Sequence, residues 1–186
     1  MTGGTEQPEL HSEPRQSLRL FYALWPDDTA RAALASLQTA VSGRKTPYGN
    51  LHLTLAFLGD QPIASLSTLQ KILAGLSVPD MTLTMDRIGY FTKSRIAWVG
   101  MHAAPEGLFT LQRHLMSALA HQGILADTRS AFKPHVTLAR DATAPDELPF
   151  EPVHWHASHV CLIASSNEQQ GAQYRILASN RANPPA

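Results

Sequence analysis

The segment from Asn50 to Gly59 reads NLHLTLAFLG, and a shorter copy of its centre, HVTLAR, occupies 135–140. Aligned on their histidines, HLTLAF and HVTLAR agree at four of six positions. In both copies leucine or valine alternates with histidine and threonine, which is the period of a β-strand with one buried face. His52 and Thr54 are therefore expected on the face away from the apolar residues, and the second copy repeats the arrangement with His135 and Thr137. A histidine followed by a hydroxyl two residues on, present twice, favours one joint role.

Length and composition predict a folded domain of ordinary size with no strong electrostatic bias. Of the 186 residues 44% are hydrophobic, and 15 basic residues balance 15 acidic ones. This composition supports a hydrophobic core. Zero net charge excludes the global basic field that drives strong non-specific binding to nucleic acids. A nucleic-acid substrate would have to be recognised locally, at an end.

The single cysteine and the two termini indicate where the protein works. Cys161 excludes an internal disulfide and fits a reducing compartment, so we expect a cytoplasmic protein. It lies in the apolar run VCLI, which favours a buried thiol over a nucleophile. Residues 1–17 have no signal-peptide pattern and predict a disordered lead-in, while 181–186 predict a flexible tail. No window is long and apolar enough to span a membrane, so we expect no membrane contact.

Residues 18–180 are expected to form one bilobal domain. Predicted helices lie at 26–42, 63–76 and 105–122. Predicted strands lie at 18–25, 50–59, 81–85, 95–100, 135–140, 154–164 and 172–178, with the strand at 95–100 paired to the one at 81–85. Each half contains a strand, a helix and a histidine strand. The pattern therefore predicts an α+β fold of two pseudo-symmetric lobes of antiparallel β-sheet, with outer helices around a central cleft.

Two facing H-x-T strands have the groups that acid–base chemistry on a phosphate needs. Histidine titrates near pH 6.5, so one imidazole can be neutral and the other protonated around neutrality. Placed on opposite sides of a scissile bond, such a pair can act as general base and general acid. The threonine hydroxyls can donate to anionic oxygens from positions fixed by the strands. Cleavage of a phosphodiester fits this inventory, because it needs positioning and charge stabilisation more than a protein nucleophile.

Other roles for histidine side chains are weaker alternatives here. A lone histidine on a strand is more often structural than catalytic, and it is the duplication that favours catalysis here. A metal site is the weaker alternative: His154 and His156 would share a strand face, but no carboxylate or cysteine accompanies them at a familiar ligand spacing. No G-x-S-x-G elbow supports a serine hydrolase. We therefore expect no metal and no cofactor, and we assign His154, His156 and His159 to surface or structural roles.

The two motifs and their flanks resemble the two-histidine (2H) phosphoesterase superfamily, which is defined by a pair of H-x-T-x motifs. Within it the chain is most similar to the RNA 2′,3′-cyclic phosphodiesterase family, also called 2′-5′ RNA ligase. The resemblance rests on four stretches: 19–23 (RLFYA), 50–59, 94–100 (SRIAWVG) and 132–141 (FKPHVTLARD). They occur in the expected order and span most of the chain, from about residue 18 to 178.

The resemblance implies a LigT-like bilobal fold and hydrolysis of a terminal RNA 2′,3′-cyclic phosphate to a 2′-phosphomonoester without a metal. His52 would be the proton donor to the leaving 3′ oxygen, and His135 the proton acceptor that activates water. Thr54 and Thr137 would hold the phosphate oxygens. Reversal of this chemistry would give ATP-independent 2′-5′ ligation. The implied partners are RNA 3′ ends or nucleotides with a cyclic phosphate, with no protein partner and a monomeric enzyme.

Arg140 and Phe57 are further candidate contacts to the substrate. Arg140 stands where the family carries a basic residue that can pair with phosphate, yet strict alternation places it opposite His135 unless the strand ends or bulges. The competing role is a surface arginine beside Asp141. Phe57 could stack on a base, although its parity with the leucines favours core packing. Candidate RNA contacts on composition alone are Arg44, Lys45 and Tyr48.

Two alternatives to RNA hydrolysis stay open at this point. One is a 2H phosphoesterase that acts on a small cyclic phosphate or a 2′-5′ oligonucleotide. The other is a binding module for RNA ends that does no chemistry. The retention of both histidines argues against the second, because binding alone does not require a proton-transfer pair.

Overall fold

The computed structural model describes residues 17–128, 131–146, 149–168 and 171–180. In chain order its elements are β1 (Ser17–Leu24), α1 (Asp28–Ser36), η1 (Leu37–Ala40), β2 (Arg44–Lys45), η2 (Tyr48–Asn50), β3 (Leu53–Pro62), η3 (Ile63–Ser65), α2 (Leu66–Ala74), β4 (Thr82–Met85), β5 (Arg87–Phe91), β6 (Ile96–Gly100), α3 (Glu106–His121), β7 (His135–Arg140), β8 (Val153–His156), β9 (Val160–Glu168) and β10 (Gly171–Ser179), where η marks a 3₁₀ helix. The predicted lead-in, apart from Ser17, and the predicted tail lie outside the described residues.

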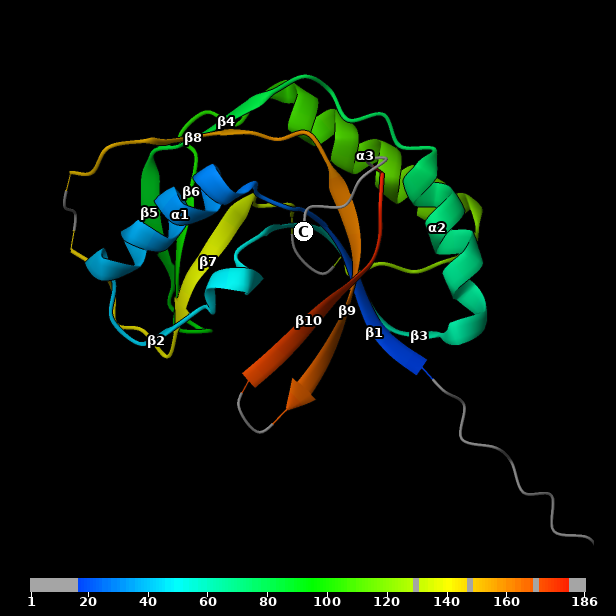
Figure 1. The fold of residues 1–186 in the computed structure, drawn as a ribbon, viewed down its shortest axis with the longest axis horizontal. Helices are drawn as coiled ribbons and strands as arrows, with labels where there is room; N and C mark the ends of the chain where they lie inside the picture. The colour runs from blue at the N-terminus through cyan, green and yellow to red at the C-terminus, as the bar shows by residue number, and fades with distance from the viewer. Residues whose placement is uncertain (1–16, 129–130, 147–148, 169–170, 181–186) are drawn as a thin grey trace, which may run out of the picture.

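An antiparallel sheet in two parts forms the centre of the molecule. Its strand order is β10-β9-β1-β3-β7-β6-β5, with β2 on β7 as well, and β4 and β8 form a separate pair. Within the described residues β3 and β7 pair only at Leu53 and Val136. Beyond that pair the four strands ending in β3 and the three beginning with β7 diverge into two lobes (Figure 1). This confirms the predicted α+β fold with two antiparallel lobes.

The two lobes exchange their helices. Helix α1 follows β1 of the first lobe, but it packs on β8, and η1 directly after it contacts β7 of the second lobe. Helix α3 follows β6 of the second lobe, but it contacts β3 and α2, and α2 covers β9 and β10. Asp27 caps α1 by accepting from the Ala30 amide at 2.7 Å, which satisfies one of the free first-turn donors.

Alternation along β1 divides the apolar residues of the first lobe between two clusters. Leu20, Tyr22 and Leu24 point into the main core beneath the helices, where the buried Tyr22 hydroxyl donates to the Leu69 carbonyl of α2 at 2.8 Å. On the other face, a smaller cluster contains Phe21, Ala23, Trp25, Cys161 and Ile163. The burial of Cys161 is confirmed, and burial raises the pKa of its thiol.

Two predictions about the strands are wrong. The strand at 81–85 corresponds to β4, but β4 pairs with β8, and β6 pairs with β7 and with β5, a strand absent from the sequence prediction. The strand predicted at 154–164 is two strands, β8 and β9, which belong to different sheets. They separate at 157–159, where the His159 carbonyl accepts from the Trp25 amide. None of the helices in the described part of the chain is long and apolar enough to cross a membrane.

A glycine within β5 explains why the sequence of this strand lacks a clear alternating pattern. Gly89 pairs with Trp98 of β6, and a Cβ at Gly89 would lie 2.1 Å from Cζ2 of Trp98. The indole therefore occupies the space that a side chain on β5 would fill. A glycine inside a strand often marks such a close approach.

Gly89→Ala is expected to destabilise the protein by ~1–3 kcal/mol, because the indole of Trp98 must leave its rotamer to admit the methyl group. Urea unfolding followed by tryptophan fluorescence measures the change. Gly49→Ala is the matched control, since nothing lies within 4 Å of a Cβ there. Equal free energies of unfolding for the two variants would show that the packing of Trp98 over Gly89 does not contribute to stability.

Candidate active site

Both histidines lie where the two lobes join. Leu53 and Val136 form the cross-strand pair between β3 and β7, and His52 and His135 each precede one of these residues. Continuing this antiparallel register would set 52 opposite 137 and 54 opposite 135. The structure brings both histidines and both threonines to the wall of one cavity of about 400 Å³.

Each imidazole is held by a carbonyl two residues earlier in the chain. His52 Nδ1 donates to the Asn50 carbonyl at 2.6 Å, and His135 Nδ1 donates to the Lys133 carbonyl at 2.6 Å. A carbonyl oxygen only accepts, so Nδ1 carries the proton in both rings and Nε2 is left for the cavity. In the neutral ring, His52 Nε2 accepts from the Thr54 hydroxyl at 3.0 Å. Alternation predicts the shared face of histidine and threonine, whereas the common tautomer follows only from the carbonyl contacts.

Aromatic side chains surround each imidazole. His52 lies 5.0 Å from Phe21, 5.4 Å from Tyr174 and 5.8 Å from Trp25, which stacks on it at 18°. His135 lies 5.0 Å from Phe91, edge to face, and 6.1 Å from Trp98. These rings restrict the orientation of the imidazoles and exclude water from their faces.

Burial makes the neutral form of both imidazoles favourable in the free protein. Burial is the main reason that the pKa of His52 falls from 6.5 to about 4; the Asn50 carbonyl raises it, and the charges of His135 and Arg140 lower it. The pKa of His135 is also lowered, chiefly by burial and further by Arg140, against the effect of the Lys133 carbonyl. An anion bound between the rings would offset these effects, because it favours the imidazolium form.

A β-bulge occurs at the same position in both motifs. Between β1 and β3 the register moves from Ala23–Thr54 to Tyr22–Ala56, which leaves Leu55 as an extra residue. Between β6 and β7 it moves from Trp98–Thr137 to Ala97–Ala139, which leaves Leu138 as the extra residue. An extra residue in one strand shifts the alternation of side chains beyond it.

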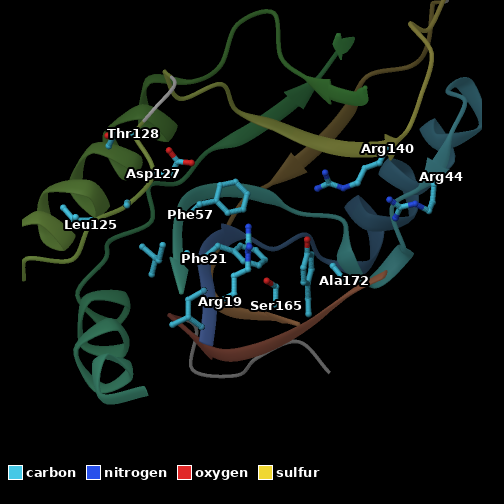
Figure 2. Close-up of a pocket in the computed structure, with 15 residues that line it drawn as sticks. Arg19, Phe21, Arg44, Phe57, Leu125, Asp127, Thr128, Arg140, Ser165 and Ala172 are labelled. Atoms are coloured by element: carbon cyan, nitrogen blue, oxygen red, sulfur yellow. The ribbon is translucent and has the colours of Figure 1, made fainter. Parts of the chain in front are cut away.

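The bulges turn the sixth motif residue of each strand toward the cleft. Phe57 has 52% of its surface exposed, and both Phe57 and Arg140 line the cavity that contains the histidines. The expectation that Phe57 packs in the core is therefore wrong, because it assumed unbroken alternation. Arg140 reaches the cleft because β7 bulges before it, which was one of the two conditions stated for this role. Figure 2 shows Phe57 and Arg140 projecting from their two strands on different sides of the open space.

The loop before the first motif contributes some of its predicted residues. Arg44 and Lys45 form β2, which pairs with the end of β7, and both line the cavity. Tyr48 is not among the lining residues. Its ring lies under the guanidinium of Arg31 at 5.8 Å, and Arg31 is also 5.8 Å from the ring of Trp25. Tyr48 therefore belongs to a stack behind His52.

Several residues around the cavity were missed by the sequence analysis. Asn50 lines the cavity, holds His52 through its carbonyl and donates from its side-chain amide to the Ala172 carbonyl at 2.8 Å. The ring residues that surround the histidines are Phe21, Trp25, Phe91, Trp98 and Tyr174. The available signal for two of them was parity, because Phe21 in β1 and Trp25 directly after it are four residues apart.

Among the histidines that the structure describes, only His52 and His135 line the cavity. His154 and His156 are exposed on β8, and His159 is buried with its Nδ1 2.6 Å from the Ser158 hydroxyl. Within the described residues, no group of three or more His, Cys, Asp or Glu side chains is arranged to hold a metal ion.

Comparisons with known proteins agree with this geometry. Residues 24–169 match the family model of the 2'-5' RNA ligase superfamily. The chain is 36% identical to the RNA 2',3'-cyclic phosphodiesterase of Escherichia coli over 73% of this chain and 78% of the relative. It is 31% identical to the protein of the same description from Thermus thermophilus, over 86% and 88%.

Solved structures give the same result. The crystal structure of E. coli LigT complexed with 3'-AMP superimposes with a TM-score of 0.75 at 30% identity, covering 88% of this chain and 97% of that one. A family model that matches most of the chain, together with relatives above 30% identity, decides the assignment. The chain belongs to the 2′-5′ RNA ligase superfamily, a family of 2H phosphoesterases.

Proposed function

We propose that this protein hydrolyses the terminal 2′,3′-cyclic phosphodiester of RNA to a 2′-phosphomonoester, by acid–base catalysis between His52 and His135. The observation that carries the proposal is the pair of imidazoles in one cavity, each with Nδ1 committed to a backbone carbonyl. Nε2 is thereby the nitrogen left for proton transfer in both rings, and in the free protein that of His52 accepts from the Thr54 hydroxyl. The curated relatives described as RNA 2',3'-cyclic phosphodiesterases support the same reaction and substrate.

The proposed step is an in-line displacement at phosphorus. His135 Nε2 takes a proton from water while the water oxygen bonds to phosphorus. The bond from phosphorus to the 3′ oxygen breaks, and His52 Nε2 gives its proton to that oxygen. The 2′ ester stays intact, and exchange with solvent then restores both imidazoles. No protein nucleophile or metal-bound water is needed in this scheme.

Neighbouring side chains supply the charge stabilisation. The hydroxyls of Thr54 and Thr137 donate to the non-bridging phosphate oxygens, since both line the cavity beside a histidine. Arg140 adds a positive charge, and it acts on the pKa values of both histidines, which indicates its proximity to them. Fixed donors such as these hydroxyls and this guanidinium stabilise developing charge without reorganisation.

Phe57 offers an exposed ring for a nucleobase.

The same machinery accounts for ligation. If an RNA 5′-hydroxyl replaces water as the attacking group, the identical step forms a 2′-5′ phosphodiester and consumes no ATP.

We take the monomer, in the cytoplasm, as the working unit, because all the residues in this scheme come from one chain. Identifying the phosphomonoester isomer formed from an RNA with a terminal cyclic phosphate tests the direction of ring opening.

His52→Ala and His135→Ala are each expected to lower kcat/KM on a 2′,3′-cyclic nucleotide by ~10²–10⁴-fold, because each removes one partner of the proton transfer. The double variant should lose much less than the product of the two single losses, since the residues act as a unit. Turnover of 2′,3′-cyclic AMP, followed by chromatography, gives the rates.

His154→Ala is the matched control, because His154 is an exposed histidine on β8 away from the cavity. It should retain full activity, and all variants should keep the wild-type circular dichroism spectrum. Wild-type turnover in either motif variant would remove the proposed mechanism.

The pH dependence of kcat/KM is expected to be bell-shaped with its maximum on the acid side of pH 6.5. This profile reports the ionisations of the free enzyme, and both histidines there have lowered pKa values, with His52 at about 4. Activity falls at low pH as the base becomes protonated and at higher pH as the acid loses its proton. A plateau centred above pH 7.5 would contradict this assignment.

The profile of kcat should lie at higher pH than that of kcat/KM. In the complex, the bound phosphate anion raises both pKa values toward or above their ordinary range. Steady-state kinetics between pH 4 and 9 at constant ionic strength measures both profiles on the same samples.

A further inference from the structure

A second, larger cavity opens directly beside the one that contains the histidines. Its volume is about 930 Å³. The two cavities share the lining residues Arg44, Phe57, Arg140, Ala172 and Tyr174. The residues particular to the larger one include Arg19, Gly59, Leu125, Asp127, Thr128 and Ser165. We call this larger cavity the outer pocket, and the shared residues make it continuous with the catalytic one.

Positive charge is concentrated in the outer pocket. Arg19, Arg44 and Arg140 line it together with one acidic residue, Asp127, in a protein whose formal net charge is zero. Arg44 has a carboxylate partner in Asp141 at 3.4 Å. Arg19 and Arg140 are both exposed, and neither forms a salt bridge with another described residue. Two guanidinium groups are therefore available to an anionic ligand.

Apolar side chains are exposed at the same place. The described residues include four exposed large hydrophobic side chains, Tyr48, Phe57, Ile63 and Leu125. Two of them, Phe57 at 52% and Leu125 at 85%, line the outer pocket. The Phe57 carbonyl accepts from the Asp127 amide at 2.8 Å, which fastens the 125–128 segment beside the ring.

Apolar side chains lie on one side and in the middle of the pocket, and arginines lie in the middle and on the other side. Figure 2 shows Leu125, Asp127 and Thr128 on one side, Arg140 and Arg44 on the other, and Arg19, Phe21 and Phe57 between them. Tyr174 belongs to both cavities. Burial raises the pKa of its hydroxyl, and the charges of Arg140 and Arg19 both oppose this, so the two guanidinium groups lie near the passage between the cavities.

We propose that the outer pocket binds the penultimate nucleotide, which lies 5′ of the nucleotide that carries the cyclic phosphate, with its base against Phe57 and Leu125 and its phosphate at Arg19. Proteins that bind single-stranded nucleic acids combine positive charges along the phosphate backbone with exposed aromatic rings on which the bases stack. This inference rests on the proposed function. It makes the enzyme selective for oligoribonucleotide ends over mononucleotides, because a mononucleotide fills only the catalytic cavity.

The experiment compares kcat/KM for 2′,3′-cyclic AMP and for an adenosine trinucleotide with a terminal 2′,3′-cyclic phosphate. The wild type is expected to prefer the trinucleotide. Arg19→Ala should lower kcat/KM on the trinucleotide about tenfold, the order expected for one charge-assisted contact, and leave turnover of the mononucleotide within about twofold. It should also flatten the salt dependence of trinucleotide turnover, since one phosphate contact is lost.

Arg175→Ala is the matched control, because Arg175 is an exposed arginine on β10 that lines neither cavity. Leu125→Asp is the second test variant: its side chain is 85% exposed, so it tolerates a carboxylate, whose charge should repel the RNA backbone and reproduce the selective loss. Equal losses on both substrates, no wild-type preference, or the same effect in Arg175→Ala would each overturn the assignment of the outer pocket.

A failure of the proposed hydrolysis can be distinguished from a failure of this inference. If neither substrate is turned over, calorimetric titration with adenosine 3′-monophosphate and with a 3′-phosphorylated adenosine trinucleotide still tests the pocket. Tighter binding of the trinucleotide that depends on Arg19 supports the subsite without catalysis. Equal affinities contradict it, whatever the reaction.

Discussion

One backbone pairing, between Leu53 and Val136, fixes the arrangement on which the site depends. Directly opposite residues of antiparallel strands lie about 4.5–5.5 Å apart, and each histidine is one residue from that pair. The separation of the imidazoles is thus set by adjacent strand backbones, not by loops. Because the pairing of the described residues of β3 and β7 stops there, the strands diverge and leave space for a ligand between them. A longer ladder would close the cavity, and no ladder would leave the histidines unrelated.

The bulges at Leu55 and Leu138 add a second use of the same strands. Without them, the sixth motif residue would point into the core, as alternation predicts. With them, one lobe presents an aromatic ring and the other a guanidinium to the same cleft, while both extra leucines stay buried. The motif HxTLA therefore encodes more than a histidine and a hydroxyl. It also sets where the strand changes face, which makes Phe57 and Arg140 neighbours of the reacting groups.

The sequence was sufficient for those features that local periodicity encodes. The faces of His52 and His135, the limits of the third helix and the two-lobed sheet follow from alternation, helical spacing and repetition. It was insufficient for the features that depend on pairing between strands distant in the sequence. The partner of β4 depends on a strand about 70 residues away, and β5 carries a glycine because Trp98 covers it. The role of Phe57 depended on a register shift that only the pairing with β1 reveals, and the rings around the histidines come from strands far apart in sequence.

The exchange of helices between the lobes has a consequence for how such a molecule can be divided. Helix α1 packs on β8, which comes from the later half of the chain, and α3 contacts β3, which comes from the earlier half. A cut after α2 would separate β1 from its partner β9, so the sheet of the first lobe would be divided between the fragments, and it would also separate α1 from β8. The internal repeat is thus interlocked: its two units share one core and are expected to unfold as one cooperative body.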